Sequence, residues 1–219
     1  MKYIDIHTHT PLCDNNEVIS IVDISSLSSP VSVLPSYCSY GIHPWFLSEE
    51  NAVAQLQLLE TLLQNNAIVA IGEAGFDAIR GAGMALQERI FGKIITLSEH
   101  YQKPLIIHCV KAWDKLLALH KSRKVKQRWI VHGFHAHYEL ASQLIRHNIS
   151  LSFGATLLHD NNLQSVFSQI PIDFLFLESD DAVAVNIVDV YRTAAMVRKM
   201  DVEMLKSGLF ENFIKEWFL

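Results

Sequence analysis

The stretch PLIIHCVKAWDKLLALHKSRKVKQRWIVHGF, residues 104–134, decides the fold class because it holds two apolar strand-like runs with a helical segment between them. Short continuous apolar runs are typical of strands that are buried on both faces of a parallel sheet. The segment between the runs, residues 112–122, has apolar side chains at helical spacing. A strand, a helix and a second strand in this order form the β-α-β unit of α/β proteins. Each apolar run also ends in a histidine, His108 in the first and His132 in the second.

The same alternation continues on both sides of this unit, and it predicts eight strands with intervening helices. The predicted strands cover residues 2–8, 17–24, 36–44, 67–75, 104–109, 128–134, 149–155 and 173–180, and the predicted helices cover residues 48–64, 85–101, 112–122, 138–147, 161–168 and 187–218, with a break at Gly208. This order predicts an α/β fold, a (β/α)8 TIM-type barrel, as a single domain over residues 1–219. No segment with helical spacing lies between the first and third strands. We therefore expect a shortened barrel, with the helices after strands 1 and 2 missing or reduced to loops and an open flank near residues 10–40.

Composition narrows the class of protein. Half of the 219 residues are hydrophobic, which excludes a disordered chain. The net charge of -5 lacks the basic footprint of tight, sequence-specific nucleic-acid binders, but it is compatible with a nuclease that binds DNA or nucleotides weakly and without sequence specificity. Three cysteines (Cys13, Cys38 and Cys109) leave one unpaired, which favours a reducing compartment. Without a signal-peptide-like segment or an apolar run of roughly 20 residues, we expect a cytoplasmic protein with no membrane partner, as a monomer or alternatively a dimer.

Histidines and carboxylates, residue types that can bind metal ions, stand at or near the ends of most predicted strands. They are His7 and His9, His43, Glu73, His108, His132 and Asp180. Side chains two positions apart on a strand point to the same face, so His7 and His9 can grip one ion. Taken alone, a histidine at a strand end is more often a structural residue than a ligand, but the carboxyl ends of barrel strands converge on one rim. The shared position on different strands therefore favours a site.

Four imidazoles and two carboxylates suit two divalent ions, with Zn, Mn and Mg all left open. We expect the metal ligands to be His7, His9, Glu73, His108, His132 and Asp180. Glu73 can bridge the two ions, and a hydroxide held by them is a nucleophile at neutral pH. Asp180 fits a general base that takes the proton of the attacking water. Glu73 and Asp180 are therefore the predicted catalytic residues.

Four further residues are candidates for substrate binding, and three of them have a structural alternative. His43 can meet a substrate phosphate or belong to a proline-fixed turn, in which Trp45 is a packed indole. Arg80 can bind phosphate or pair with Asp77 at the surface, which contributes little. Lys111 follows the fifth strand, and His135 either reaches the cleft or starts a helix at the surface.

Two residues near the predicted ligands have predicted roles other than metal binding. Glu178 lies two residues before Asp180, on the same strand face, and is a candidate to orient a ligand histidine. Cys109 follows His108 and faces the opposite side of its strand, so a buried, unreactive thiol is expected there.

The motifs together resemble the TatD family of metal-dependent hydrolases, within the amidohydrolase-like barrels. The matching segments are DIHTH, GIHPW, GEAGFD, QERIF followed by KPLIIHC, VHGF, LESD and ENFIKEWF, which run through most of the chain outside residues 10–37. The resemblance implies a two-metal site with His7, His9 and Asp180 on one side, His108 and His132 on the other, and Glu73 shared. It also implies a phosphodiesterase activity, since members are chiefly described as deoxyribonucleases. Other members and neighbours cleave acyl esters or amides.

The departures from the family pattern concern the substrate and not the metal. Many members have an arginine two residues after the histidine of strand 5, where this chain has Val110, so a phosphate contact there is absent or shifted to Lys111. The usual Cys-Phe-Ser-Gly after the histidine of strand 6 is replaced by residues 133–136, and no Asn-Glu-Pro follows Asp180. We therefore predict a two-metal phosphodiesterase or deoxyribonuclease. The alternatives are a metal-dependent deacylase or amidohydrolase acting on a small non-nucleic substrate, and a binding protein without turnover.

Overall fold

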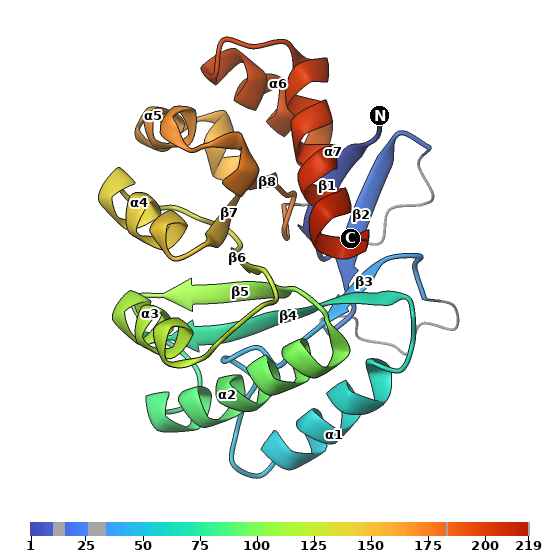
Figure 1. Ribbon diagram of the computed structural model, residues 1–219, viewed down its shortest axis with the longest axis vertical. Helices are drawn as coiled ribbons and strands as arrows, with labels where there is room; N and C mark the ends of the chain where they lie inside the picture. Colours follow the sequence, from blue (N-terminus) through green and yellow to red (C-terminus); the bar gives the residue numbers. More distant parts are fainter. Residues whose placement is uncertain (11–15, 26–33, 183, 219) are drawn as a thin grey trace. The chain divides into compact units, whose positions relative to one another are not determined.

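The computed structural model describes residues 1–10, 16–25, 34–182 and 184–218. Figure 1 shows strands and helices alternating along the chain, and the strand pairs whose register is defined are all parallel. The described residues form eight strands, β1 to β8, in the (β/α)8 fold class that the sequence predicts. The fold prediction is confirmed.

The chain divides into two compact units, which we name by their position in the sequence. The terminal unit contains residues 1–22 and 131–219, and the central unit contains residues 23–130. The chain passes from one unit to the other within β2 and within β6. A single domain over residues 1–219 stays a prediction.

The terminal unit brings together the two ends of the sequence. Its strands are β1 (Tyr3–Thr8), most of β2 (Val18–Asp23), the end of β6 (Trp129–Val131), β7 (Ile149–Phe153) and β8 (Leu175–Leu177). Its helices are α4 (Tyr138–Arg146), α5 (Asn161–Gln169), α6 (Ile187–Val197) and α7 (Val202–Phe218), with short 3-10 turns η1 (Ala155–Leu158) and η2 (Ile172–Phe174). β1 pairs with β2, β7 pairs with β8, and a parallel bridge between Thr8 and Asp180 joins the end of β1 to the segment after β8.

The central unit is built on three parallel strands. They are β3 (Cys38–Tyr40), β4 (Ile68–Asp77) and β5 (Leu105–Val110), and the helices are α1 (Ala52–Leu62), α2 (Met84–Tyr101) and α3 (Trp113–Ser122). β4 pairs with β3 on one side and with β5 on the other. Its register to β5 shifts between Ile71 and Ala74, so Glu73 lies at an irregularity of the strand.

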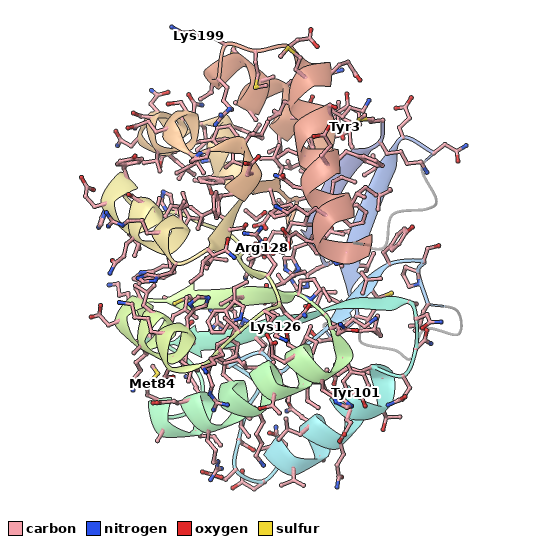
Figure 2. All side chains as sticks on the ribbon, in the orientation of Figure 1. Tyr3, Met84, Tyr101, Lys126, Arg128 and Lys199 are labelled. Atoms are coloured by element: carbon pink, nitrogen blue, oxygen red, sulfur yellow. The ribbon has the colours of Figure 1, made fainter. Side chains whose placement is uncertain are left out.

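Helix α2 supplies much of the core of the central unit, and Figure 2 labels both of its ends, Met84 and Tyr101. Ile90, Phe91 and Ile94 are buried at helical spacing along one face of the helix. The Phe91 ring packs edge-on against Phe76 of β4, with 5.2 Å between ring centroids. Burying such a side chain contributes about 1.5–3 kcal/mol to folding. The helix therefore fixes β4, the strand that carries Glu73.

The shortening of the barrel is confirmed in the part of the chain that the structure describes. The element order runs from β1 to β2 to β3, and no helix is found between β1 and β3 among residues 9–10, 16–25 and 34–37. The expected open flank near residues 10–40 falls partly on residues 11–15 and 26–33, which lie outside the described residues.

The predicted helix break at Gly208 is wrong. The break lies between α6 and α7, where Lys199 adopts a left-handed backbone conformation with φ of 52°. Gly208 lies inside α7, and a Cβ atom there would come within 2.4 Å of the Ile172 side chain. The glycine therefore permits close packing of the helix and does not end it.

None of the described helices is both long enough and apolar enough to cross a lipid bilayer.

Candidate functional site

His7 in β1 and His9, which follows the last residue of the strand, face a single carboxylate of the terminal unit. The two imidazoles lie edge to face, with 4.9 Å between their ring centroids, as expected for residues two apart on a strand. The Nε2 atom of His7 lies 3.6 Å from Asp180 Oδ1, and the Nε2 atom of His9 lies 3.4 Å from the same oxygen. His7 is fully buried, whereas His9 and Asp180 are partly open to solvent. The metal-donor side chains of His7, His9 and Asp180 therefore lie close together.

The backbone of β1 holds Asp180 in place. The Asp180 N–H donates to the His7 carbonyl at 3.0 Å, and the Asp180 carbonyl accepts from the His9 N–H at 3.1 Å. Asp180 has a left-handed backbone with φ of 54°, which turns the chain at this point. The spacing of the three donors is therefore set by strand pairing.

His132 adds a third imidazole to this group of the terminal unit. Its ring centroid lies 4.7 Å from that of His7. Its Nδ1 atom faces Glu178 Oε1 at 3.7 Å, and the same oxygen accepts a hydrogen bond of 2.6 Å from the N–H of Gly133. Gly133 has φ of 55°, a conformation in which glycine is preferred. A carboxylate on the Nδ1 side leaves Nε2 as the ligand atom, so Glu178 has the geometry expected of a residue that orients His132.

A cavity of about 180 Å³ opens beside Asp180 in the terminal unit. Three carboxylates line it, and one of them, Glu178, is fully buried. The lining includes Gly133, Phe134, Thr156, Glu178, Asp180 and Asp181. The cavity is therefore acidic, which favours cations and hydrogen-bond donors.

Asp5 ties β1 to the segment that leads to Asp180. Its carboxylate is fully buried and accepts hydrogen bonds from the Ser179 N–H at 2.9 Å and the Ser179 hydroxyl at 2.7 Å. Burial raises the pKa of Asp5 to about 7, against the opposing effect of these two hydrogen bonds. The sequence did not indicate this role, because Asp5 and Ser179 lie far apart in the chain.

The central unit contains a second group of donors, His43, Glu73 and His108, whose ligand atoms lie within 4.8 Å of one another. His43 Nδ1 accepts a hydrogen bond of 3.1 Å from the Trp45 N–H, so the proton of a neutral His43 is on Nε2. That nitrogen lies 3.1 Å from Glu73 Oε2 and donates to it. Both side chains are buried. His43 therefore orients the carboxylate that the sequence predicts as a bridging ligand.

The Asp77 carboxylate contacts His108, a member of this group, and the Trp45 indole. Its Oδ2 accepts from the Trp45 indole at 2.6 Å and lies 3.2 Å from His108 Nε2, which leaves Nδ1 of His108 for a metal. Burial alone would raise the pKa of Asp77. Hydrogen bonds from Trp45, from the N–H groups of Ile79 and Arg80 and from His108 outweigh it and hold the pKa at about 2.

The alternative in which the Arg80 side chain pairs with Asp77 at the surface is therefore wrong. Asp77 is buried, and the Arg80 guanidinium lies over the Trp45 ring instead. The signal for Asp77 was present in the sequence, since it stands four residues after Glu73 and thus on the same face of a strand that continues to position 77.

The donor chemistry of both groups fits divalent metal ions, because imidazole and carboxylate are ligands of Zn²⁺ and Mn²⁺. Four of the predicted ligands gather in the terminal unit, namely His7, His9, His132 and Asp180, and two gather in the central unit, namely Glu73 and His108. That all six hold two ions in one site stays a prediction.

The predicted substrate contacts lie in different surroundings. His43 is buried beside Glu73, as described above, and the Arg80 side chain is exposed. Lys111 is exposed directly after β5, with φ of 49°. His135 is exposed and pairs with Asp160 at 2.9 Å at the start of α5. Substrate binding by these residues stays a prediction.

Residues 32–217 match the family model described as TatD related DNase. The chain belongs to the TatD-related DNase family. The resemblance seen in the sequence motifs is thereby confirmed, and the activity class is that of a metal-dependent hydrolase.

Relatives with similar sequences include two named as uncharacterized metal-dependent hydrolases. The protein YjjV of Escherichia coli K12 is 27% identical over 150 residues, which cover 67% of this chain and 58% of that protein. A protein of Haemophilus influenzae is 23% identical over 97% of this chain and 98% of its own length. The 3'-5' ssDNA/RNA exonuclease TatD of Edwardsiella piscicida is 36% identical over 93 residues, 39% of this chain and 34% of that protein.

A crystal structure of a TatD family hydrolase from Entamoeba histolytica has the same fold. Its TM-score is 0.77 at 18% identity, and the match covers 99% of this chain and 98% of that chain.

Proposed function

We propose that the chain is a two-metal phosphodiesterase that hydrolyses nucleic acid from its ends. The observation that carries this proposal is the convergence of His7 and His9 on Asp180, in a chain of the TatD-related DNase family. The name of the Edwardsiella piscicida relative, a 3'-5' ssDNA/RNA exonuclease, supports a nucleic acid as the substrate class.

Divalent ions, when bound, would lower the pKa of water and neutralise charge on a phosphate. His7, His9 and Asp180 would hold one ion, and Glu73, His108 and His132 would supply the ligands of the other. Asp180 is the only one of the two predicted catalytic carboxylates that is substantially exposed, so it can take the proton of the attacking water and return it to the leaving oxygen. Glu178 and His43 would orient His132 and Glu73.

The first experiment measures metal content by elemental analysis together with exonuclease activity. The substrates are 5'-labelled and 3'-labelled single-stranded oligonucleotides with Mn²⁺, Mg²⁺ or Zn²⁺. We expect two ions in the wild type and one in the His108→Ala/His132→Ala variant, with activity lost. Unchanged metal content in that variant would remove both histidines from the site.

A second candidate function is that of a metal-dependent deacylase or amidohydrolase. The carboxylates of Glu178 and Asp181 beside Asp180 favour it, because they would repel a polyanion. A panel of p-nitrophenyl acyl esters and anilides, assayed with the same metal-loaded enzyme, separates the two. Turnover of an acyl ester or an anilide in the absence of any oligonucleotide cleavage would replace the phosphodiesterase proposal.

A further inference from the structure

The loop after β4 carries an arginine whose charge is not paired with a carboxylate among the described residues. The Arg80 side chain is exposed, and its guanidinium lies over the ring of Trp45, 4.0 Å from the centroid. A guanidinium stacked on an indole gains a cation–π interaction and keeps its N–H edge available. The N–H groups of the Arg80 guanidinium are therefore available to donate hydrogen bonds to an anion.

Hydrogen bonds fix the backbone of this loop, residues 77–82. Asp77 Oδ1 accepts from the N–H of Ile79 at 2.8 Å and from that of Arg80 at 2.9 Å. The buried Gln87 side chain donates to the carbonyls of Asp77 and Ala82, at 2.9 and 2.6 Å. Asp77 and Gln87 thus hold both ends of the loop, and Arg80 lies between them.

Gly81 seats the loop against the segment that carries Trp45. It has φ of 96°, and a Cβ atom there would lie 2.2 Å from the Pro44 carbonyl oxygen. The next residue, Ala82, donates its N–H to that same oxygen at 3.1 Å. Only glycine fits both the conformation and the space. Arg80 is therefore placed by its backbone, before any ligand binds.

Trp45 is fixed as well, and it connects Arg80 to the candidate metal donors. Its indole N–H donates to Asp77 Oδ2 at 2.6 Å. Its ring lies edge-on to the imidazoles of His43 and His108, with centroids 4.8 and 5.7 Å away. One indole thus carries a guanidinium on its face and two imidazoles of the site at its edges.

We propose that Arg80, stacked on Trp45, is a phosphate subsite beside the donor group His43, Glu73 and His108. The inference rests on the proposed function, since it assigns a place for a phosphate of the substrate. Arginine binds phosphate oxygens with two parallel N–H donors, and a fixed side chain loses little freedom on binding. This subsite recognises the phosphate group itself, so it takes nucleotides of any base.

The test is calorimetric titration of the metal-loaded enzyme with thymidine 5'-monophosphate, with thymidine as the uncharged reference. Arg80→Met is expected to weaken binding of the monophosphate about 10-fold or more, the loss typical of a charged hydrogen-bonding partner. Arg80→Lys keeps the charge but not the planar fork, so an intermediate loss is expected. Arg89→Met is the matched control, because Arg89 is an exposed arginine of the same unit that pairs with Glu49. It should bind the monophosphate as the wild type does.

Variants of Trp45 separate stacking from simple charge. Trp45→Leu removes the ring and should weaken monophosphate binding nearly as much as Arg80→Met. Trp45→Phe keeps a ring but loses the bond to Asp77, so a smaller loss is expected. In oligonucleotide assays Arg80→Met should raise KM and reduce the slope of log affinity against log salt by about 1.

The outcomes distinguish the subsite from the proposed function. Equal monophosphate binding by Arg80→Met and wild type, with metal content equal, would overturn the subsite even if oligonucleotides are cleaved. Arg80-dependent monophosphate binding in an enzyme that cleaves no phosphodiester would support the subsite and overturn the proposed function. An equal loss of monophosphate affinity in Arg89→Met would show that the affinity depends only on the overall charge of the protein, and it would also overturn the subsite.

Discussion

The donor groups of the two units differ in how much the protein itself holds them. In the central unit, Glu73 and Asp77 lie 3.1 and 3.2 Å from imidazole nitrogens, and Asp77 also accepts an indole N–H. In the terminal unit, the imidazoles of His7 and His9 lie 3.6 and 3.4 Å from Asp180 Oδ1, beyond the usual hydrogen-bond length. The central group is therefore ordered by hydrogen bonds between side chains, whereas the donors of the terminal group are spaced widely enough to admit a cation between them.

The largest expected effect comes from Asp180→Asn, which removes the charge on which the terminal group converges. We expect kcat to fall about 1,000-fold, within the range for loss of a general acid–base group. Steady-state kinetics on an oligonucleotide measure it, with Asp189→Asn as control because Asp189 is exposed and pairs with Arg192. Retention of most of the activity would mean that Asp180 is not the base.

Metal removal should affect the terminal group most. A ligand at 100 times its Kd stabilises the folded state by about 2.7 kcal/mol, so EDTA should lower the Tm of the wild type. The His7→Ala/His9→Ala variant should lose most of this difference, and His43→Ala should lose less of it. Thermal unfolding with and without EDTA measures both. An equal loss in the two variants would contradict the contrast between the units.

Glu178→Gln tests the orientation of His132. The amide keeps the shape of the side chain but removes the carboxylate that faces Nδ1, and the expected loss is about 10-fold to 100-fold in metal affinity or activity. Mn²⁺ binding followed by electron paramagnetic resonance reads the affinity without substrate. Glu139→Gln, at an exposed position of α4, is the control. If Glu178→Gln binds Mn²⁺ as tightly as the wild type does, the Glu178 carboxylate does not orient His132.

The smallest effect is expected from Ser179→Ala, which removes one hydrogen bond to the buried Asp5. The free energy of unfolding should fall by about 1 kcal/mol, and it should fall further if the carboxylate is left poorly solvated. Urea denaturation measures the change, with the exposed Ser168→Ala as reference. No difference between the two serines would show that Asp5 does not hold the segment before Asp180.

The fold and most candidate ligands could be predicted because their signals are local. Apolar runs and their terminal histidines lie within a few residues of one another, as at His108 and His132. The spacing of Asp77 from Glu73 indicates the strand face on which it lies, but its hydrogen bonds to Trp45 and Gln87 join residues that are distant in sequence and could not be predicted. The role of Gly208 could not be predicted because the side chain that it accommodates, Ile172, is distant in sequence. Contacts of this kind depend on tertiary packing and produce no periodic pattern in the sequence.

The bridge between Thr8 and Asp180 spans 172 positions of the chain and so bears on the order of folding. Closing so long a segment costs more chain entropy than closing a local one, and contacts of high sequence separation form slowly. During synthesis the donors His43, Glu73 and His108 leave the ribosome well before Asp180 does. His7 and His9 are synthesised before these donors, but they cannot contact the Asp180 carboxylate until that residue has been synthesised. The terminal donor group therefore takes shape only after residue 180 has been made, and a metal ion that needs all three donors could bind only from that point on.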